Sequence, residues 1–168
     1  MPAKKYLYNN GGTTTEKAAT VASAGDANDG DIVALDSNGK LDNSVMPTGI
    51  GADVAIITTS EALAANDLVN VWNSTGAKVR KADATSVGKE AHGFVVAAFA
   101  SGAAATVYFE GTNAGLTGLT PGVQYLSTTP GAATATPPSA SGNVVQRIGF
   151  ATSATALNFQ SQPPIVLA

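Results

Sequence analysis

The chain contains no cysteine, which excludes disulfide bridges, zinc sites built on thiolates and cysteine nucleophiles. Histidine is almost absent as well: His92 is the only one, and it stands beside a glycine at the start of an apolar stretch. A Ser-His-Asp triad would have to use this residue, and the sequence has no Gly-x-Ser-x-Gly elbow. We therefore expect His92 to be structural, and we expect no catalytic residue, no cofactor and no enzymatic activity.

Charge is also scarce. Charged residues make up 12% of the 168 residues, about half the share of an ordinary soluble domain. The net charge is -3, and the small basic group between residues 78 and 89 is diluted by Asp83 and Glu90. A nucleic-acid partner would require a basic surface on a larger scale. Nucleic acid is therefore not an expected partner.

Long apolar runs are missing too. No run approaches the roughly 18 apolar residues that a membrane span needs, and no apolar segment follows the first lysines as in a secretory signal. We expect a protein that is made in the cytoplasm and has no membrane partner. Apolar residues reach 44%, but aromatic residues only 6%, which predicts a core of small side chains. The surface is then left to small polar residues and alanine, which suits a subunit packed against neighbours.

Residues 1–30 have no lasting period of 2 or 3.6 and are interpreted as an extended arm. Two alternatives remain open, a disordered tail and an arm that becomes ordered on another subunit. In the second case Tyr6, Leu7, Tyr8 and Val21 are the expected contacts. A short helix that starts at Thr14 or Thr15 and is stopped by Gly25 is also possible.

Residues 31–53 are predicted to form a hairpin and a hinge. Ile32 to Leu35 is typical of a short strand, and Ser37-Asn38-Gly39 favours a type I′ turn before the chain returns at Lys40. Pro47 ends the hairpin, and the stretch TGIGAD that follows indicates a flexible joint.

Residues 54–168 are interpreted as one β domain. Short β-forming runs recur, and the prolines fall between them, where they interrupt no ladder hydrogen bond. Residues 60–67 are left open between a helical turn, a strand and a loop. The predicted fold is all-β, a compact antiparallel β-sandwich or barrel with an extended N-terminal arm. The expected strands span residues 54–58, 68–72, 77–81, 93–99, 105–110, 123–127, 144–150, 156–159 and 165–167.

Three further features each have a structural and a functional interpretation. Trp72 and Tyr108 are typical core residues, and as the alternative they are anchors for self-association. The acidic stretch DANDGD, Asp26 to Asp31, invites a calcium site, but its fifth and twelfth positions are Gly30 and Ser37, so the EF-hand register fails. A solvated acidic turn is preferred and a metal site of another kind is left open.

Three stretches resemble a β domain found in structural proteins of tailed bacteriophages, among them capsid decoration (cement) proteins and head fibres. They are GFVVAAFASGAAATVYFEG (93–111), GLTPGVQYLSTTPG (118–131) and SGNVVQRIGFATSATALNF (141–159). GDIVALDSNGKLDNSVMP (30–47) resembles the segment that precedes such domains in fibre-type proteins. The resemblance implies a virion protein, commonly a homotrimer, and carries no catalytic residue.

A single arm, hinge and domain suit a decoration protein better than a fibre with a long shaft. The expected function is therefore to bind the outer surface of the phage head and stabilise the shell. The expected partners are the major capsid protein, gripped by the arms, and further copies of the chain in a homotrimer. The alternative is a short tail or baseplate fibre with a receptor- or carbohydrate-binding face.

Overall fold

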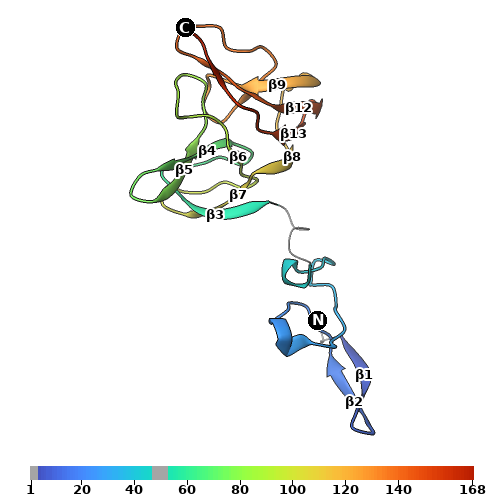
Figure 1. Ribbon diagram of the computed structural model, residues 1–168. Helices are drawn as coiled ribbons and strands as arrows, with labels where there is room; N and C mark the ends of the chain where they lie inside the picture. The colour runs from blue at the N-terminus through green and yellow to red at the C-terminus, as the bar shows by residue number, and fades with distance from the viewer. Residues whose placement is uncertain (1–3, 47–52) are drawn as a thin grey trace. The chain divides into compact units, whose positions relative to one another are not determined.

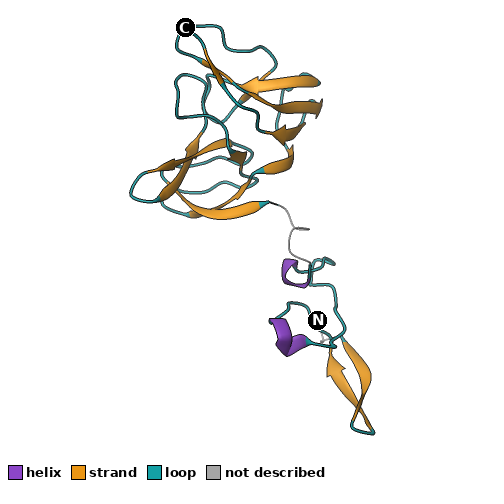
Figure 2. Ribbon diagram, viewed as in Figure 1, coloured by secondary structure: helices purple, strands orange, loops and turns teal. Residues whose placement is uncertain are grey.

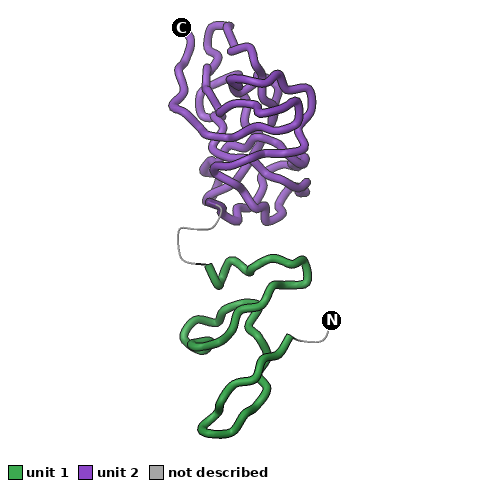
Figure 3. The backbone as a smooth tube through the Cα atoms, turned by 90° about the vertical axis from the view of Figure 1, so that its right-hand side faces the viewer, with its two compact units in different colours: residues 1–51 green, residues 52–168 purple. Residues whose placement is uncertain are grey.

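The computed structural model describes residues 4–46 and 53–168. The chain divides into two compact units, residues 1–51 and 52–168 (Figure 3). Strands make up 43% and helical turns 4% of the described residues (Figure 2), which confirms the all-β prediction. In the described residues no helix is long and apolar enough to cross a membrane. Most of the predicted joint, residues 47–52, lies outside the described residues.

The N-terminal unit begins with an antiparallel hairpin of β1 (Lys5–Asn10) and β2 (Thr13–Ala18). Gly11 and Gly12 form the two-residue connection, and both have the positive φ that a type I′ turn requires. The predicted helix from Thr14 or Thr15 is wrong, because both residues lie in β2. The glycine pair favours chain reversal at this point, and the hairpin outcompetes a helix that has few apolar contacts to stabilise it.

The rest of this unit has little regular structure. It contains two single turns of 3-10 helix, η1 (Gly25–Asn28) and η2 (Asn43–Val45). The predicted strand at Ile32 to Leu35 is reduced to one parallel bridge, between Val33 and Thr20.

The predicted turn after this segment is present, since the Asp36 backbone N–H donates to the Lys40 carbonyl at 2.8 Å. Its type differs from the prediction, because only Gly39 has a positive φ and Asn38 does not. The Asp36 carboxylate accepts from the backbone N–H groups of Asn38 and Lys40, at 2.8 and 2.9 Å. These bonds, the Lys40 one foremost, hold the Asp36 pKa below its usual value. They stabilise a turn other than type I′.

The second unit begins with a closed five-stranded barrel in the order β3-β5-β4-β6-β7 (Figure 1). All its pairs are antiparallel except β3 with β5, which is parallel at Thr58 and Thr59 and closes the barrel. The barrel is filled by small side chains, among them Val69, Val79 and Val107. The strands are β3 (Val54–Thr59), β4 (Leu68–Asn73), β5 (Ala77–Lys81), β6 (Gly93–Phe94) and β7 (Ala104–Tyr108).

A five-stranded antiparallel sheet follows, in the order β10-β9-β12-β13-β8. β11 (Val144–Val145) and β14 (Ile165–Val166) pair with each other in a separate two-stranded antiparallel sheet. The strands of the sheet are β8 (Glu110–Ala114), β9 (Gly122–Leu126), β10 (Ala133–Thr134), β12 (Arg147–Ser153) and β13 (Ala156–Gln160).

A shared apolar cluster joins the barrel to the sheet. Phe94 of β6 lies at its centre: its ring stacks on Tyr108 at 5.4 Å and meets the edge of Phe159 at 5.7 Å. Ile148 and Leu157 of the sheet complete the cluster and are fully buried. Barrel and sheet are therefore one packed domain and not two independent layers.

Most predicted strands of this domain are present, but the runs 93–99, 105–110 and 144–150 differ from the prediction, and the last of them divides into β11 and β12, which belong to different sheets. The run 105–110 divides, because β7 ends at Tyr108 and β8 starts at Glu110 in the other sheet. The run 93–99 is shortened to β6, after which only Phe99 forms a bridge, with Leu63. That bridge is the one strand-like contact in residues 60–67, which are otherwise a loop.

We predict that Gly149→Ala strongly destabilises the β domain. Gly149 lies in β12 with φ 130°, and an added Cβ would lie 2.0 Å from the Asn158 carbonyl oxygen of β13. Gly118→Ala is the matched control, since its φ is also positive, 71°, and an added Cβ meets nothing within 4 Å. We expect a loss of about 1 kcal/mol for the control and about 3 kcal/mol for Gly149→Ala. Denaturant unfolding measures both, and equal losses would contradict the steric argument.

Candidate functional site

Asp31 is the centre of a polar cluster that ties the hairpin of the N-terminal unit to the segment after it. Its carboxylate forms an ion pair with Lys17 of β2 and accepts a hydrogen bond from Thr20 Oγ1 at 2.8 Å. Asn28 Nδ2 donates to it at 3.0 Å and the Tyr6 hydroxyl at 3.4 Å. The Asp31 side chain is only 6% exposed. Four side chains from three segments therefore converge on one carboxylate.

These bonds fix the charge of the cluster. The hydrogen bond from Lys17, followed by those from Asn28 and Thr20, holds the pKa of Asp31 far below its usual value. The same contact with Asp31 raises the pKa of Lys17. Both groups therefore stay charged from acidic to alkaline pH, and the cluster is a permanent structural clasp.

The hairpin places the residues that were predicted to form one partner-binding group on two opposite faces. Tyr6 pairs with Lys17 across the ladder, and Tyr6 and Tyr8 lie on one face with ring centroids 6.3 Å apart. Lys17 Nζ lies 5.6 Å from the centre of the Tyr8 ring on that same face. Leu7 points to the opposite face and is 70% exposed. Tyr6, Leu7 and Tyr8 therefore do not form one contact surface.

Val21, the fourth predicted contact, follows the Thr20 bridge and is 41% exposed. It belongs to a larger group, because the N-terminal unit exposes many large apolar side chains and no residue in 4–46 is fully buried. The exposed apolar residues of this unit are Leu7, Val21, Ile32, Val33, Leu35 and Leu41.

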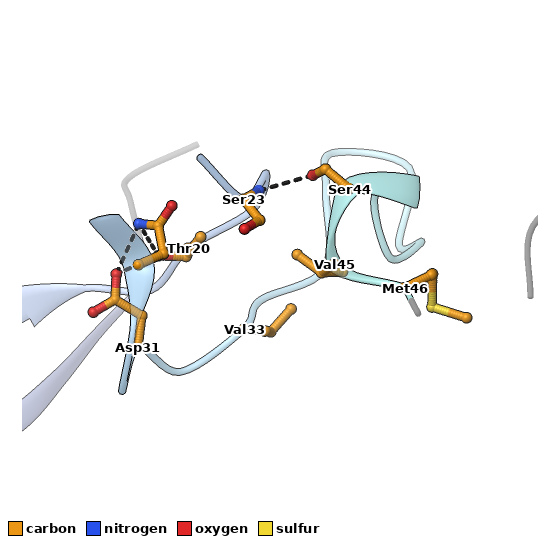
Figure 4. A pocket seen from close by; sticks show the side chains of 8 residues that line it. Thr20, Ser23, Asp31, Val33, Ser44, Val45 and Met46 are labelled. Carbon is orange, nitrogen blue, oxygen red and sulfur yellow. Dashed lines mark hydrogen bonds between the residues drawn. The ribbon is translucent and has the colours of Figure 1, made fainter. Parts of the chain in front are cut away.

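An open pocket of about 390 Å³ lies between the Asp31 cluster and η2 (Figure 4). One part of its wall is polar and includes Thr20 and Asp31, whereas the part next to η2 is apolar and is formed by Val33, Val45 and Met46. The Ser23 backbone N–H donates to Ser44 Oγ at 2.8 Å and ties the two sides together. The pocket therefore offers an apolar surface inside a framework held by hydrogen bonds.

The acidic stretch Asp26 to Asp31 does not converge on one point. Asp31 is turned into the cluster with Lys17, and Asp29 donates its backbone N–H to the Asp26 carbonyl in a local turn. Across residues 4–46 and 53–168, no three carboxylate or imidazole groups are placed to share a metal ion.

Trp72 lies on the outer side of the barrel, half-buried, at the end of β4. Its indole Nε1 donates to Ser60 Oγ at 3.1 Å, and the Arg80 guanidinium lies 4.5 Å from the ring centre. Arg80 is itself held by Asn70 Oδ1, at 3.0 Å, and by the Gly88 carbonyl, at 2.6 Å. Tyr108, the other residue predicted for self-association, is half-buried against Phe94. Trp72 therefore packs on Arg80 and Ser60, whereas Tyr108 packs against Phe94 in the cluster that joins barrel and sheet.

Two ionisable groups of the β domain, His92 and Asp83, have structural partners. His92 accepts the Val71 backbone N–H at Nδ1, 3.1 Å away, and so holds its loop against β4. The Asp83 carboxylate forms an ion pair with Lys89, with Lys89 Nζ 3.1 Å from Asp83 Oδ2. Burial alone would raise the pKa of Asp83, but the hydrogen bonds of Thr85 and Lys89 outweigh it and lower the pKa.

The sequence analysis did not identify Lys17, Thr20 and Asn28 as partners of Asp31. These residues approach one another only after the chain reverses at Gly11 and Gly12. The signal that was available is the Asn-Gly-Gly turn between two runs rich in tyrosine and threonine, which predicts a hairpin.

Comparison of the chain with models of protein families, with curated protein sequences and with solved structures finds no match in any of the three.

We predict that Asp31→Asn loosens the N-terminal unit and leaves the β domain intact. The amide cannot form the ion pair with Lys17 and offers one acceptor where the carboxylate offers two. Asp29→Asn is the matched control, because the Asp29 side chain is exposed and forms none of the ion pairs found among the described residues. Amide hydrogen exchange in β1 and β2 should speed up about fivefold or more for Asp31→Asn. Unchanged exchange would show that the cluster does not hold the hairpin.

The order of the hairpin should depend on pH only at the extremes. Because the pKa of Asp31 is lowered in the folded unit, its contribution is complete above the ordinary carboxyl pKa of 3.8 and is lost as pH falls through the folded value. Because the pKa of Lys17 is raised, its contribution is complete below 10.5 and is lost as pH rises through the folded value. NMR shifts of the hairpin amides should therefore stay constant between about pH 4 and pH 10. A transition inside this window would contradict the clasp.

Proposed function

We propose that the protein is a decoration protein of a bacteriophage head, which grips the major capsid protein through its N-terminal unit and places the β domain on the outer surface. The observation that carries this proposal is the contrast in burial between the two units. The N-terminal unit has no fully buried residue in 4–46 and exposes six large apolar side chains, whereas the β domain buries two apolar clusters and exposes some large apolar side chains, such as Ile56, besides them. A unit with this surface is suited to being covered by another protein.

The exposed side chains supply the binding free energy that such a role needs. Fully burying one valine, leucine or isoleucine contributes about 1.5–3 kcal/mol. Six such side chains are 41–70% exposed in the N-terminal unit, so a partner that covers several of them gains a substantial part of this amount for each. The ordered hairpin lowers the entropic cost of binding, because its backbone is already fixed by the Asp31 cluster.

The β domain has the features of a rigid, passive structural part. Each strand of the closed barrel pairs with a neighbour on both sides, so the barrel exposes no unpaired edge strand. The cluster around Phe94 joins the barrel to the sheet. In a homo-oligomer, several N-terminal units would bind the shell at once, and avidity would make the attachment durable. The shell is then stabilised against the outward pressure of packed DNA.

A short tail or baseplate fibre is the second candidate function. Trp72 favours it, because a half-buried indole on the outer side of a barrel, with Ser60, Lys78 and Arg80 near it, is the kind of surface on which a sugar ring can stack. Binding to host surface polysaccharide that is lost in Trp72→Ala, without affinity for shells, would favour this candidate over the first.

We predict that Val21→Asp weakens binding to undecorated shells at least tenfold, because a carboxylate at an apolar contact must be desolvated. Val87→Asp is the matched control: Val87 is exposed in a loop of the β domain, and its substitution should leave binding unchanged. Sedimentation of protein with shells measures both, and the wild type should also raise the temperature at which shells open. Equal binding by the two variants, or no binding by the wild type, would contradict the proposed attachment.

A further inference from the structure

Leu7 lies on a hairpin face that its own unit does not cover. The opposite face, with Tyr6 and Lys17, is the one that contacts Asp31 and the following segment. Beside Leu7, Lys5 and Glu16 form an exposed ion pair at 2.8 Å, so the surroundings of the leucine carry no net charge. A 70% exposed leucine in a neutral setting is suited to insertion into an apolar surface of another molecule.

The same unit presents an apolar surface of matching kind. Val33, Val45 and Met46 form the apolar wall of the open pocket beside η2, and Val33 is 45% exposed (Figure 4). Leu7 cannot enter the pocket of its own chain, because the pocket adjoins Asp31 and Leu7 is on the far side of the hairpin from Asp31.

The charges of the two segments are complementary. Residues 4–19 contain three lysines and one glutamate, a net charge of +2. Residues 20–46 contain five aspartates and one lysine, a net charge of -4. Lys17 and Asp31 already form an ion pair within one chain, which leaves +1 on the hairpin and -3 on the pocket-bearing segment. Two hairpins brought together would therefore repel each other, whereas a hairpin and a pocket-bearing segment attract each other.

We propose that the hairpin of one copy docks on the pocket-bearing segment of a second copy, with Leu7 inserted against Val33, Val45 and Met46. Each chain carries one such leucine and one such pocket, so identical copies supply both parts in equal number. The contact is head-to-tail and must close into a ring for a finite assembly. This inference concerns contacts between copies and does not depend on the binding of a shell.

The absence of cysteine allows a direct test by disulfide cross-linking in the full chain. L7C and V33C are made as separate variants, one of them enlarged by an affinity tag, and the two chains are co-expressed and oxidised. We expect mixed disulfide-linked dimers in at least fivefold greater yield than from L7C co-expressed with N38C. Asn38 is the control position because it is exposed in a turn of the same segment and does not line the pocket. A second pair, L7C with V45C, repeats the test if V33C does not fold.

Three results would overturn the inference. The first is a yield from both pocket pairs no greater than from the control pair. The second is equal cross-linking by L7C alone, which would place Leu7 against Leu7. The third is a wild-type mass of 16.7 kDa by light scattering at working concentrations, the mass of a single chain. Shell binding by a protein that fails these tests would leave the proposed function standing and assign Leu7 to the capsid contact instead.

Discussion

The hydrogen-bonded carboxylate of Asp31 is the interaction on which the N-terminal unit depends. In an ordinary domain, buried apolar side chains hold the segments together, but no residue in 4–46 is fully buried. The segments are joined instead by the Asp31 carboxylate, which bonds to Lys17, Thr20 and Asn28 and is itself almost fully buried. Because a hairpin of two strands is marginally stable by itself, removing this anion leaves little that would keep β1 and β2 in place.

The β domain, in contrast, is held together by buried apolar side chains and by the closure of its barrel. Its barrel closes through the parallel contact of β3 with β5, and the ring of Phe94 links the barrel to the sheet through Tyr108 and Phe159. The interior of the barrel is filled mainly by small side chains such as Val69, Val79 and Val107, so its close packing depends on backbone approach. At Gly93 an added Cβ would lie 2.5 Å from the Tyr108 carbonyl oxygen. Glycine is therefore part of the packing of this domain and not only a turn residue.

The sequence predicted the all-β class and most strands of the β domain, because turn residues mark the ends of its short apolar runs. The pairing of β4 with β5 follows from one tight turn and could be read locally. The division of 105–110 between two sheets could not, since the change of sheet at Phe109 depends on long-range pairing of β3 and β13. In the N-terminal unit the hairpin signal was present but was outweighed by a helix-like pattern at Thr14 and Thr15. The Asp31 cluster could not be predicted, because Lys17, Thr20 and Asn28 approach Asp31 only after the chain has folded.

The distribution of charge limits which molecules can cover the exposed apolar side chains of the N-terminal unit. Most of its acidic residues lie in the segment that carries the pocket, and carboxylates near the apolar wall disfavour association with other acidic surfaces. A partner that covers this wall must therefore bring positive charge together with an apolar side chain. The hairpin of another copy satisfies both conditions, because it carries Leu7 together with a net positive charge, and so does any capsid surface with the same combination. Selectivity in this unit thus comes from the pairing of charge with apolar contact, because the apolar contact alone would admit too many partners.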